Sequence, residues 1–130
     1  MALAQFIKRF LSIGGSVGSQ PARKQPIPDV TSIDVERIVE RDFKYEFTTV
    51  MDILKELGTA RVQLAALKLA NGSVEKLRSN IESAKRDYRD ILGHAEYPAY
   101  MKKGFGELPA DERLRIIDDD WRQYNEWLKK

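Results

Sequence analysis

Residues 60–82 decide the fold, and they read ARVQLAALKLANGSVEKLRSNIE. The first eleven residues are rich in alanine and leucine, which are strong helix formers. Asn71 and Gly72 both tolerate the left-handed backbone that often ends a helix, and Ser73 is a favourable N-cap for the next one. The stretch therefore predicts two consecutive helices that reverse direction at a tight turn, an αα-hairpin.

The second arm of this hairpin is predicted to run from residue 74 to about residue 96. Spacings of three and four residues place one apolar stripe on its core-facing side. The stripe consists of Leu77, Ile81, Ala84, Tyr88, Ile91 and Ala95. Pro98 lacks a backbone donor and disfavours helical geometry at Tyr97, so the helix should end or kink there.

Both flanks of the hairpin also carry helical patterns. The apolar spacing over residues 33–57 predicts one long helix, although Phe43, Tyr45 and Phe47 alternate as a strand would. After a loop through Gly104 and Gly106, Pro109 begins a last helix. The seam of that helix is Leu114, Ile117, Trp121, Tyr124 and Leu128.

These patterns together predict an all-α fold, a small helical bundle that contains an αα-hairpin. The expected core is the set of large apolar residues at helical spacing. It comprises Ile38, Val50, Leu54, Leu77, Ile81, Tyr88, Ile91, Leu114, Ile117 and Trp121.

The first 29 residues differ from the rest of the chain. Residues 2–13 place Leu3, Phe6, Ile7 and Phe10 on one helical face, with Lys8 and Arg9 largely opposite, which predicts a short basic amphipathic helix. The glycines and prolines of residues 14–29 indicate a flexible tether. We therefore expect an amphipathic helix with its tether over residues 1–29 and a helical domain over residues 30–130.

Part of the chain resembles a known group of proteins. The segments Arg-Val-Gln-Leu-Ala-Ala-Leu-Lys-Leu-Ala-Asn-Gly and Asp-Tyr-Arg-Asp-Ile-Leu-Gly-His-Ala-Glu-Tyr-Pro lie within residues 59–101. This region resembles small uncharacterised bacterial helical proteins of unknown function. The resemblance implies a helical fold and a bacterial source, and it brings no activity and no functional residue with it.

Composition narrows the classes of function. A length of 130 residues suits one domain, and a net charge of +2 gives no reason to expect a polyanionic partner. The chain has no cysteine, which excludes thiolate metal sites and cysteine nucleophiles and suits a reducing compartment. With no apolar run long enough to span a bilayer, we expect a cytoplasmic location, or one peripheral to a membrane.

Two acidic groups are candidates for metal binding. Asp87, Asp90 and His94 recur on adjacent turns of a predicted helix, but a carboxylate-bridged metal site needs further ligands from facing helices, and His94 is the one histidine of the chain. The run Asp118-Asp119-Asp120 points in three directions on a helix, so we expect a solvated face there. Common nucleotide, zinc and serine-nucleophile motifs are missing from the sequence. We therefore expect no metal, no cofactor and more likely no enzymatic activity.

Two segments are candidates for contact with a partner. The first is the apolar face of residues 2–13, because a helix this short needs a surface to fold against. The second is the loop that carries Tyr97, Tyr100 and Phe105 beside lysines, which suits an anionic or peptide ligand. The alternative for these three aromatic residues is that they fold back and cover the end of the bundle.

The leading hypothesis is a non-catalytic helical interaction protein that recruits a protein partner, or a second copy of itself, through the N-terminal helix. The surface that this helix contacts is left open, and it includes the protein's own domain. The alternative is a peripheral membrane protein in which the same helix contacts an anionic membrane surface. Nucleic acid is an unlikely partner, because the basic residues of residues 74–96 are interleaved with acidic ones.

Overall fold

The computed structural model describes residues 26–103 and 108–130. The predicted N-terminal helix and Phe105 lie outside the described residues. Within them the regular elements are all helical, which confirms the all-α fold. The elements are α2 (Ser32–Asp42), the 3-10 turn η1 (Lys44–Glu46), α3 (Phe47–Leu54), α4 (Ala60–Ala70), α5 (Val74–Glu96), α6 (Pro98–Lys103) and α7 (Ala110–Lys129).

The αα-hairpin is formed by α4 and α5, as predicted. Asn71 adopts a left-handed conformation with a φ of 50°, and Gly72 follows with a φ of 85°. The hydroxyl of Ser73 accepts a hydrogen bond from the backbone N–H of Lys76 at 3.1 Å and so caps α5. The turn residues thus carry out the roles that their chemistry predicts, and α4 packs along α5.

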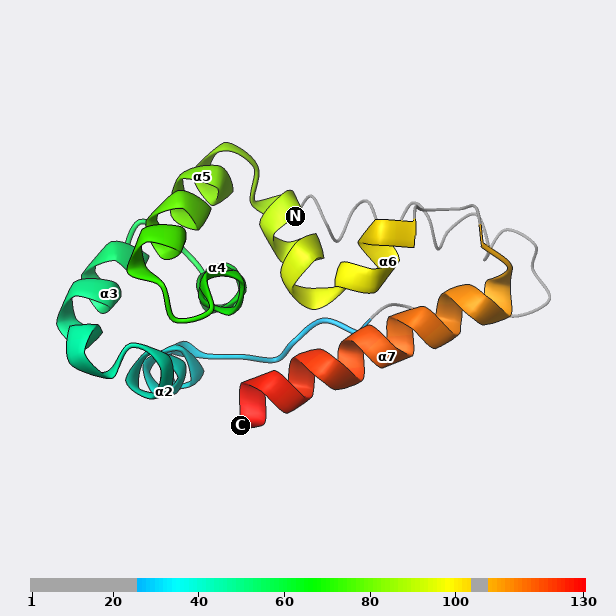
Figure 1. Cartoon of the computed structure of the whole chain (residues 1–130), viewed down its shortest axis with the longest axis horizontal. Helices are drawn as coiled ribbons and strands as arrows, with labels where there is room; N and C mark the ends of the chain where they lie inside the picture. Colours follow the sequence, from blue (N-terminus) through cyan, green and yellow to red (C-terminus); the bar gives the residue numbers. More distant parts are fainter. Residues whose placement is uncertain (1–25, 104–107) are drawn as a thin grey trace.

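The single helix expected over residues 33–57 is wrong, because the chain breaks at Phe43. Phe43 has a φ of −130° and a ψ of 42°, and η1 redirects the chain into α3. A continuous helix of this length would extend about 37 Å at 1.5 Å per residue, whereas the break divides the segment into the shorter helices α2 and α3. The break turns α3 toward α5 and buries Phe43, Val50 and Leu54 (Figure 1). The alternation of Phe43, Tyr45 and Phe47 does not form a strand.

α5 is also interrupted, where the sequence predicted an unbroken helix. Asp87 has a φ of −157° and a ψ of 96°, which is extended backbone. The Asp87 carboxylate accepts a hydrogen bond from the backbone N–H of Arg89 at 3.1 Å, as an N-cap does for a new helix. Figure 1 shows the two parts of α5 at an angle. The kink rotates the second part, so that Leu92 and Glu96 are buried while Tyr88 is half-buried.

The last two helices extend to the opposite end of the molecule from α2 and α3 (Figure 1). Pro98 ends α5 as predicted, and it begins α6 where a loop was expected. α7 runs back toward α2, where a guanidinium nitrogen of Arg41 donates to the carbonyl oxygen of Trp127 at 2.7 Å. The guanidinium carbon of Arg41 also lies 5.3 Å from the centre of the Trp127 ring. A cation at the C-terminal end of α7 matches the helix dipole.

Most of the predicted core is buried, and three residues are not. Seven of the expected residues are buried, namely Ile38, Val50, Leu54, Leu77, Ile81, Ile91 and Ile117. Tyr88, Leu114 and Trp121 are only half-buried. On α7 the buried residues are Ile117, Asp120, Tyr124 and Leu128. Asp120 therefore occupies the buried position that the sequence pattern assigns to Trp121.

Candidate functional site

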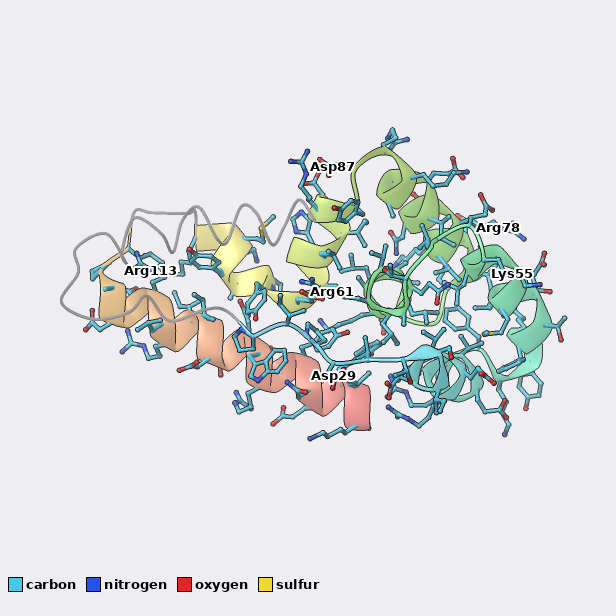
Figure 2. All side chains as sticks on the ribbon, turned by 180° about the vertical axis from the view of Figure 1, so that it is seen from behind. Asp29, Lys55, Arg61, Arg78, Asp87 and Arg113 are labelled. Atoms are coloured by element: carbon cyan, nitrogen blue, oxygen red, sulfur yellow. The ribbon has the colours of Figure 1, made fainter. Side chains whose placement is uncertain are left out.

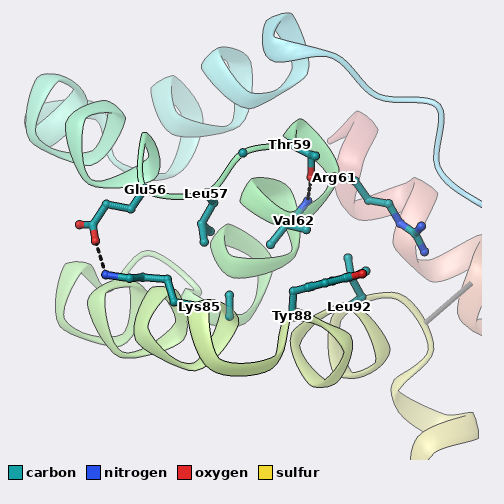
Figure 3. Close-up of a pocket in the computed structure, with 10 residues that line it drawn as sticks. Glu56, Leu57, Thr59, Arg61, Val62, Lys85, Tyr88 and Leu92 are labelled. Atoms are coloured by element: carbon teal, nitrogen blue, oxygen red, sulfur yellow. Dashed lines mark hydrogen bonds and ion pairs between the residues drawn. The ribbon is translucent and has the colours of Figure 1, made fainter. Parts of the chain in front are cut away.

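A pocket of about 660 Å³ lies between the turn that joins α3 to α4 and the kinked helix α5. Its walls include five apolar or aromatic side chains, those of Leu57, Val62, Ala84, Tyr88 and Leu92 (Figure 3). The volume falls within the range of about 300–1,000 Å³ that is typical of ligand pockets. The pocket therefore offers mainly apolar surface to a ligand or a partner side chain.

The kink in α5 shapes this pocket. Ala84 and Lys85 come from the part of α5 before Asp87, and Tyr88 and Leu92 come from the part after it. The pocket thus spans the two halves of the helix. A straight α5 would change the angle between them, so the extended backbone at Asp87 is part of the architecture of the pocket.

The opposite wall is held by hydrogen bonds from α4. The side-chain amide of Gln63 donates to the carbonyl oxygens of Leu54 and Leu57, both at 2.9 Å. The hydroxyl of Thr59 accepts a hydrogen bond from the backbone N–H of Val62 at 3.3 Å and caps α4. These bonds fix the turn between α3 and α4 against the start of α4, and so they fix the wall that carries Leu57.

The charged groups at the rim are paired with one another. The ammonium of Lys85 lies 2.7 Å from a Glu56 carboxylate oxygen and 3.4 Å from a Glu82 oxygen. The hydrogen bond with Glu56 and the negative charges of both carboxylates raise the pKa of Lys85. Glu82 lies next to the lining residues Glu56 and Lys85, and this group of two carboxylates and one ammonium has a net negative charge.

Arg61 lines the pocket but extends away from Leu57 toward α7 (Figure 3). Its guanidinium donates to both carboxylate oxygens of Glu96, at 2.7 and 2.8 Å. Figure 2 shows Arg61 inside the molecule. The Arg61 side chain is 12% exposed, and Glu96 is fully buried. The pair therefore joins α4 to the end of α5 in a bidentate geometry that is among the stronger hydrogen-bonding arrangements.

The charges of Glu96 and Arg61 also act on the hydroxyl of Tyr124 in α7. Burial raises the pKa of the Tyr124 hydroxyl above its usual range, and the negative charge of Glu96 raises it further. The hydroxyl has no hydrogen-bond partner among the residues that the structure describes. Burial also raises the pKa of Glu96, and the hydrogen bonds and charge of Arg61 oppose that rise.

Asp120 holds the start of α6 from within α7. Its carboxylate accepts hydrogen bonds from the backbone N–H groups of Ala99 at 3.3 Å and Tyr100 at 3.0 Å. Asp120 is buried, and burial raises the pKa of its carboxyl while the two hydrogen bonds oppose the rise. The expectation of a solvated acidic face is therefore wrong for Asp120, although Asp118 and Asp119 are exposed.

Replacing Asp120 by alanine is expected to lower the free energy of unfolding by about 1–3 kcal/mol, because two donors at the start of α6 lose their acceptor. Amide hydrogen exchange at Ala99 and Tyr100 should become faster than in the unsubstituted protein. Asp119→Ala is the matched control, because Asp119 is exposed and pairs with Arg122 on the surface. Equal effects of the two substitutions on Ala99 and Tyr100 would contradict this role of Asp120.

The residues predicted to contact a partner have separate locations. Tyr97 and Tyr100 are buried with Ile117 in a small apolar cluster, which is the alternative in which these aromatic residues cover the end of the bundle. The hydroxyl of Tyr97 donates to the carbonyl oxygen of Pro26. Phe105 and the four residues Leu3, Phe6, Ile7 and Phe10 lie outside the described part of the chain. Of the residues predicted to contact a partner, the structure describes only Tyr97 and Tyr100, and both are buried.

The predicted metal candidates do not form a cluster. The Asp87 carboxylate is bound by the guanidinium of Arg89 at 2.8 Å, and its backbone has left the helix that was to align it with Asp90 and His94. Figure 2 places Asp87 at the outer edge of the molecule. Among residues 26–103 and 108–130, no group of three or more acidic, histidine or cysteine side chains is arranged to hold a metal ion.

Sequence reasoning missed the buried polar residues, and a signal for them was present. Asp120 lies three residues after Ile117 and four before Tyr124, so helical spacing alone places it on the buried seam. Glu96 likewise follows Leu92 by four residues. A charged residue at an apolar position of a stripe predicts a buried partner, and this signal was outweighed by the general preference of charged residues for the surface.

Comparison of the chain with protein-family models, with curated proteins and with solved structures gives no match. In the described part of the protein, no helix is long and apolar enough to cross a membrane.

Proposed function

We propose that this protein is a non-catalytic helical interaction protein, and that the pocket beside the kink of α5 is its docking surface for a protein partner. The supporting observation is that polar residues lining the pocket already have partners within the protein, which leaves its apolar side chains for a ligand. Lys85 and Glu56 pair with each other, Arg61 pairs with Glu96, and Thr59 caps a helix. The apolar walls are what the pocket offers to a binding partner.

The partner that suits such a pocket is an amphipathic helix. A helix bound in a groove presents apolar side chains at positions i, i+3, i+4 and i+7. Leu3, Phe6, Ile7 and Phe10 of this chain follow that spacing. A labelled peptide with the sequence of residues 1–14 is therefore a suitable probe for the docking surface, whether the natural partner is a second copy of the chain or another protein.

Fluorescence anisotropy with this peptide tests the proposal. The receptor is the full chain carrying Phe6→Ala and Phe10→Ala. These substitutions weaken the chain's own apolar N-terminal pattern, so that it does not compete with the labelled peptide for the pocket. We expect saturable binding by this chain. Adding Val62→Arg should abolish the binding, because a guanidinium would enter the apolar space between α4 and α5.

The control is Thr48→Arg, which adds the same charge at an exposed position of α3 that does not line the pocket. This variant should bind the peptide as its parent does. Tyr88→Ala provides a second pocket variant in case Val62→Arg unfolds. Absence of saturable binding, or equal binding by the Val62→Arg and Thr48→Arg chains when both are folded, would rule the pocket out as the docking surface.

A second candidate function is peripheral association with an anionic membrane, because residues 1–28 contain basic and apolar residues but no acidic one. Co-sedimentation of the full chain with vesicles of anionic lipid distinguishes the two functions. A membrane-binding protein should sediment with the vesicles, and Lys8→Glu with Arg9→Glu should abolish this. A protein that uses the pocket alone should stay in solution. We propose a cytoplasmic location in the one case and a location peripheral to a membrane in the other.

A further inference from the structure

We infer that, in the absence of a partner, the pocket beside the kink of α5 is occupied by residues 2–13 of the same chain. The inference rests on the proposed function, because it names an occupant for the same docking surface. It adds that the protein is self-occupied, so that a partner must displace its N-terminal segment.

The first argument is the match between the apolar pattern and the walls of the pocket. An isolated helix of twelve residues is marginal in water, so residues 2–13 gain stable structure only against a surface. Phe6 and Phe10 provide large apolar side chains, and Val62, Tyr88 and Leu92 provide apolar walls. Burying such side chains against apolar walls favours docking of the segment.

The second argument is charge. The segment carries Lys8 and Arg9, and residues 1–28 contain no acidic residue. Glu56 and Lys85 line the pocket, and Glu82 lies beside them, so that two carboxylates pair with the single ammonium of Lys85. A basic segment beside this group therefore meets a net negative charge, and opposite charges across an interface favour its formation.

The third argument is the place where the described chain begins. The Pro26 carbonyl oxygen is bound by the hydroxyl of Tyr97, the residue that follows α5. Leu92, in the wall of the pocket, precedes Tyr97 by five residues, which is about 8 Å along a helix. The connection between residue 13 and Pro26 is twelve residues, with a reach of about 40 Å when fully extended. The segment can therefore reach the pocket of its own chain.

This connection also favours the protein's own segment over a second copy. A connection of only twelve residues gives the attached segment an effective concentration on the order of millimolar. A second copy at micromolar concentration competes poorly against it. A partner must therefore bind with enough affinity to offset this local concentration, which makes the N-terminal segment a built-in competitor.

Peptide competition tests the inference. The labelled peptide of residues 1–14 should bind the unsubstituted full chain about tenfold more weakly than the Phe6→Ala, Phe10→Ala chain, because the apparent Kd rises as the open fraction of the pocket falls. Gln5→Ala with Ser12→Ala is the matched control, because it changes two residues outside the apolar set and should preserve the competition. Equal, tight binding to the substituted and unsubstituted chains would overturn self-occupation while leaving the docking surface intact. Binding to neither chain would overturn both.

Paramagnetic broadening then locates the segment. Because the chain has no cysteine, Ser12→Cys provides one attachment site for a nitroxide label. The amide signals of Thr59, Val62 and Tyr88 should broaden, and those of Glu36 on α2 should not. Phe6→Ala with Phe10→Ala should remove the broadening.

A mixture of copies separates the two sources of the segment. Isotope-labelled chains without nitroxide are mixed with unlabelled chains that carry it. Self-occupation predicts no broadening in this mixture. Broadening that appears only in the mixture would assign the pocket to a second copy, and broadening at α6 and α7 instead of the pocket would show that the segment docks elsewhere. Either result would overturn the inference.

Discussion

Replacing Arg61 by methionine is expected to lower the free energy of unfolding by about 3–5 kcal/mol, because Glu96 then remains buried without its counter-charge. Two hydrogen bonds of 2.7 and 2.8 Å are lost. A stable domain has only about 5–15 kcal/mol of unfolding free energy in total. Equilibrium denaturation in urea measures the loss directly.

The double variant Arg61→Met with Glu96→Leu is the control. Replacing both members of a buried ion pair by apolar residues is often neutral or stabilising, so the double variant should regain most of the loss. The free energy of unfolding of Arg61→Lys should lie between those of the unsubstituted protein and Arg61→Met, because an ammonium keeps the charge but not the bidentate geometry. A single variant as stable as the unsubstituted protein would show that the pair contributes little to folding.

The loss in Arg61→Met should also depend on pH. Without Arg61, burial raises the pKa of Glu96 further above its unfolded value, so the folded state takes up a proton more readily than the unfolded state. The penalty is then fully present above the folded pKa and disappears as the pH falls below the unfolded value of about 4.3. The variant should therefore be closer to the unsubstituted protein at acidic pH than at neutral pH.

Local signals in the sequence were sufficient for the hairpin and for the overall class of fold. Asn71, Gly72 and Ser73 each have a backbone or capping preference that acts within a few residues, and the structure shows all three preferences realised. Such local preferences do not depend on the rest of the molecule, so they can be predicted from the sequence alone.

The two helix interruptions were not predicted, because the apolar spacing of the sequence continues through both of them. Phe43 continues the apolar spacing of residues 33–57, so periodicity alone predicts no break there. After the break, α3 packs against both α2 and α5. Asp87 likewise interrupts a stripe with the correct spacing, and its capping bond to Arg89 is available only once the helix has opened.

The candidate site depended on these interruptions, so it could not be predicted. The pocket spans the kink at Asp87, and its opposite wall is the turn that follows α3. The sequence predicts the turn at Gly58 and Thr59, but it places that turn after one long helix instead of the short α3, and it predicts no kink at Asp87. The sequence pattern places Tyr88 in the core, because in an unbroken α5 this residue would lie on the buried stripe.

Ile81→Ala is expected to lower the free energy of unfolding by about 2–5 kcal/mol, whereas Trp121→Ala should cost only about 1 kcal/mol. Ile81 is 1% exposed within the main core, and its removal leaves a cavity between neighbours that cannot fully collapse. Trp121 is half-buried on α7, and the buried position beside it is Asp120. Urea denaturation of both variants, with the same slope of free energy against urea concentration, compares the two losses.

The difference between these two variants tests which face of α7 is buried. If the seam ran through Trp121, as the apolar spacing of the sequence predicts, truncating this large ring would cost as much as truncating Ile81 or more, because tryptophan loses about 3–5 kcal/mol in a core. The buried face through Ile117, Asp120 and Tyr124 predicts the opposite order. Tyr124→Ala is the matched control, because it truncates an aromatic ring of the same helix at a buried position. It should cost clearly more than Trp121→Ala, and the reverse order would place Trp121 back in the core.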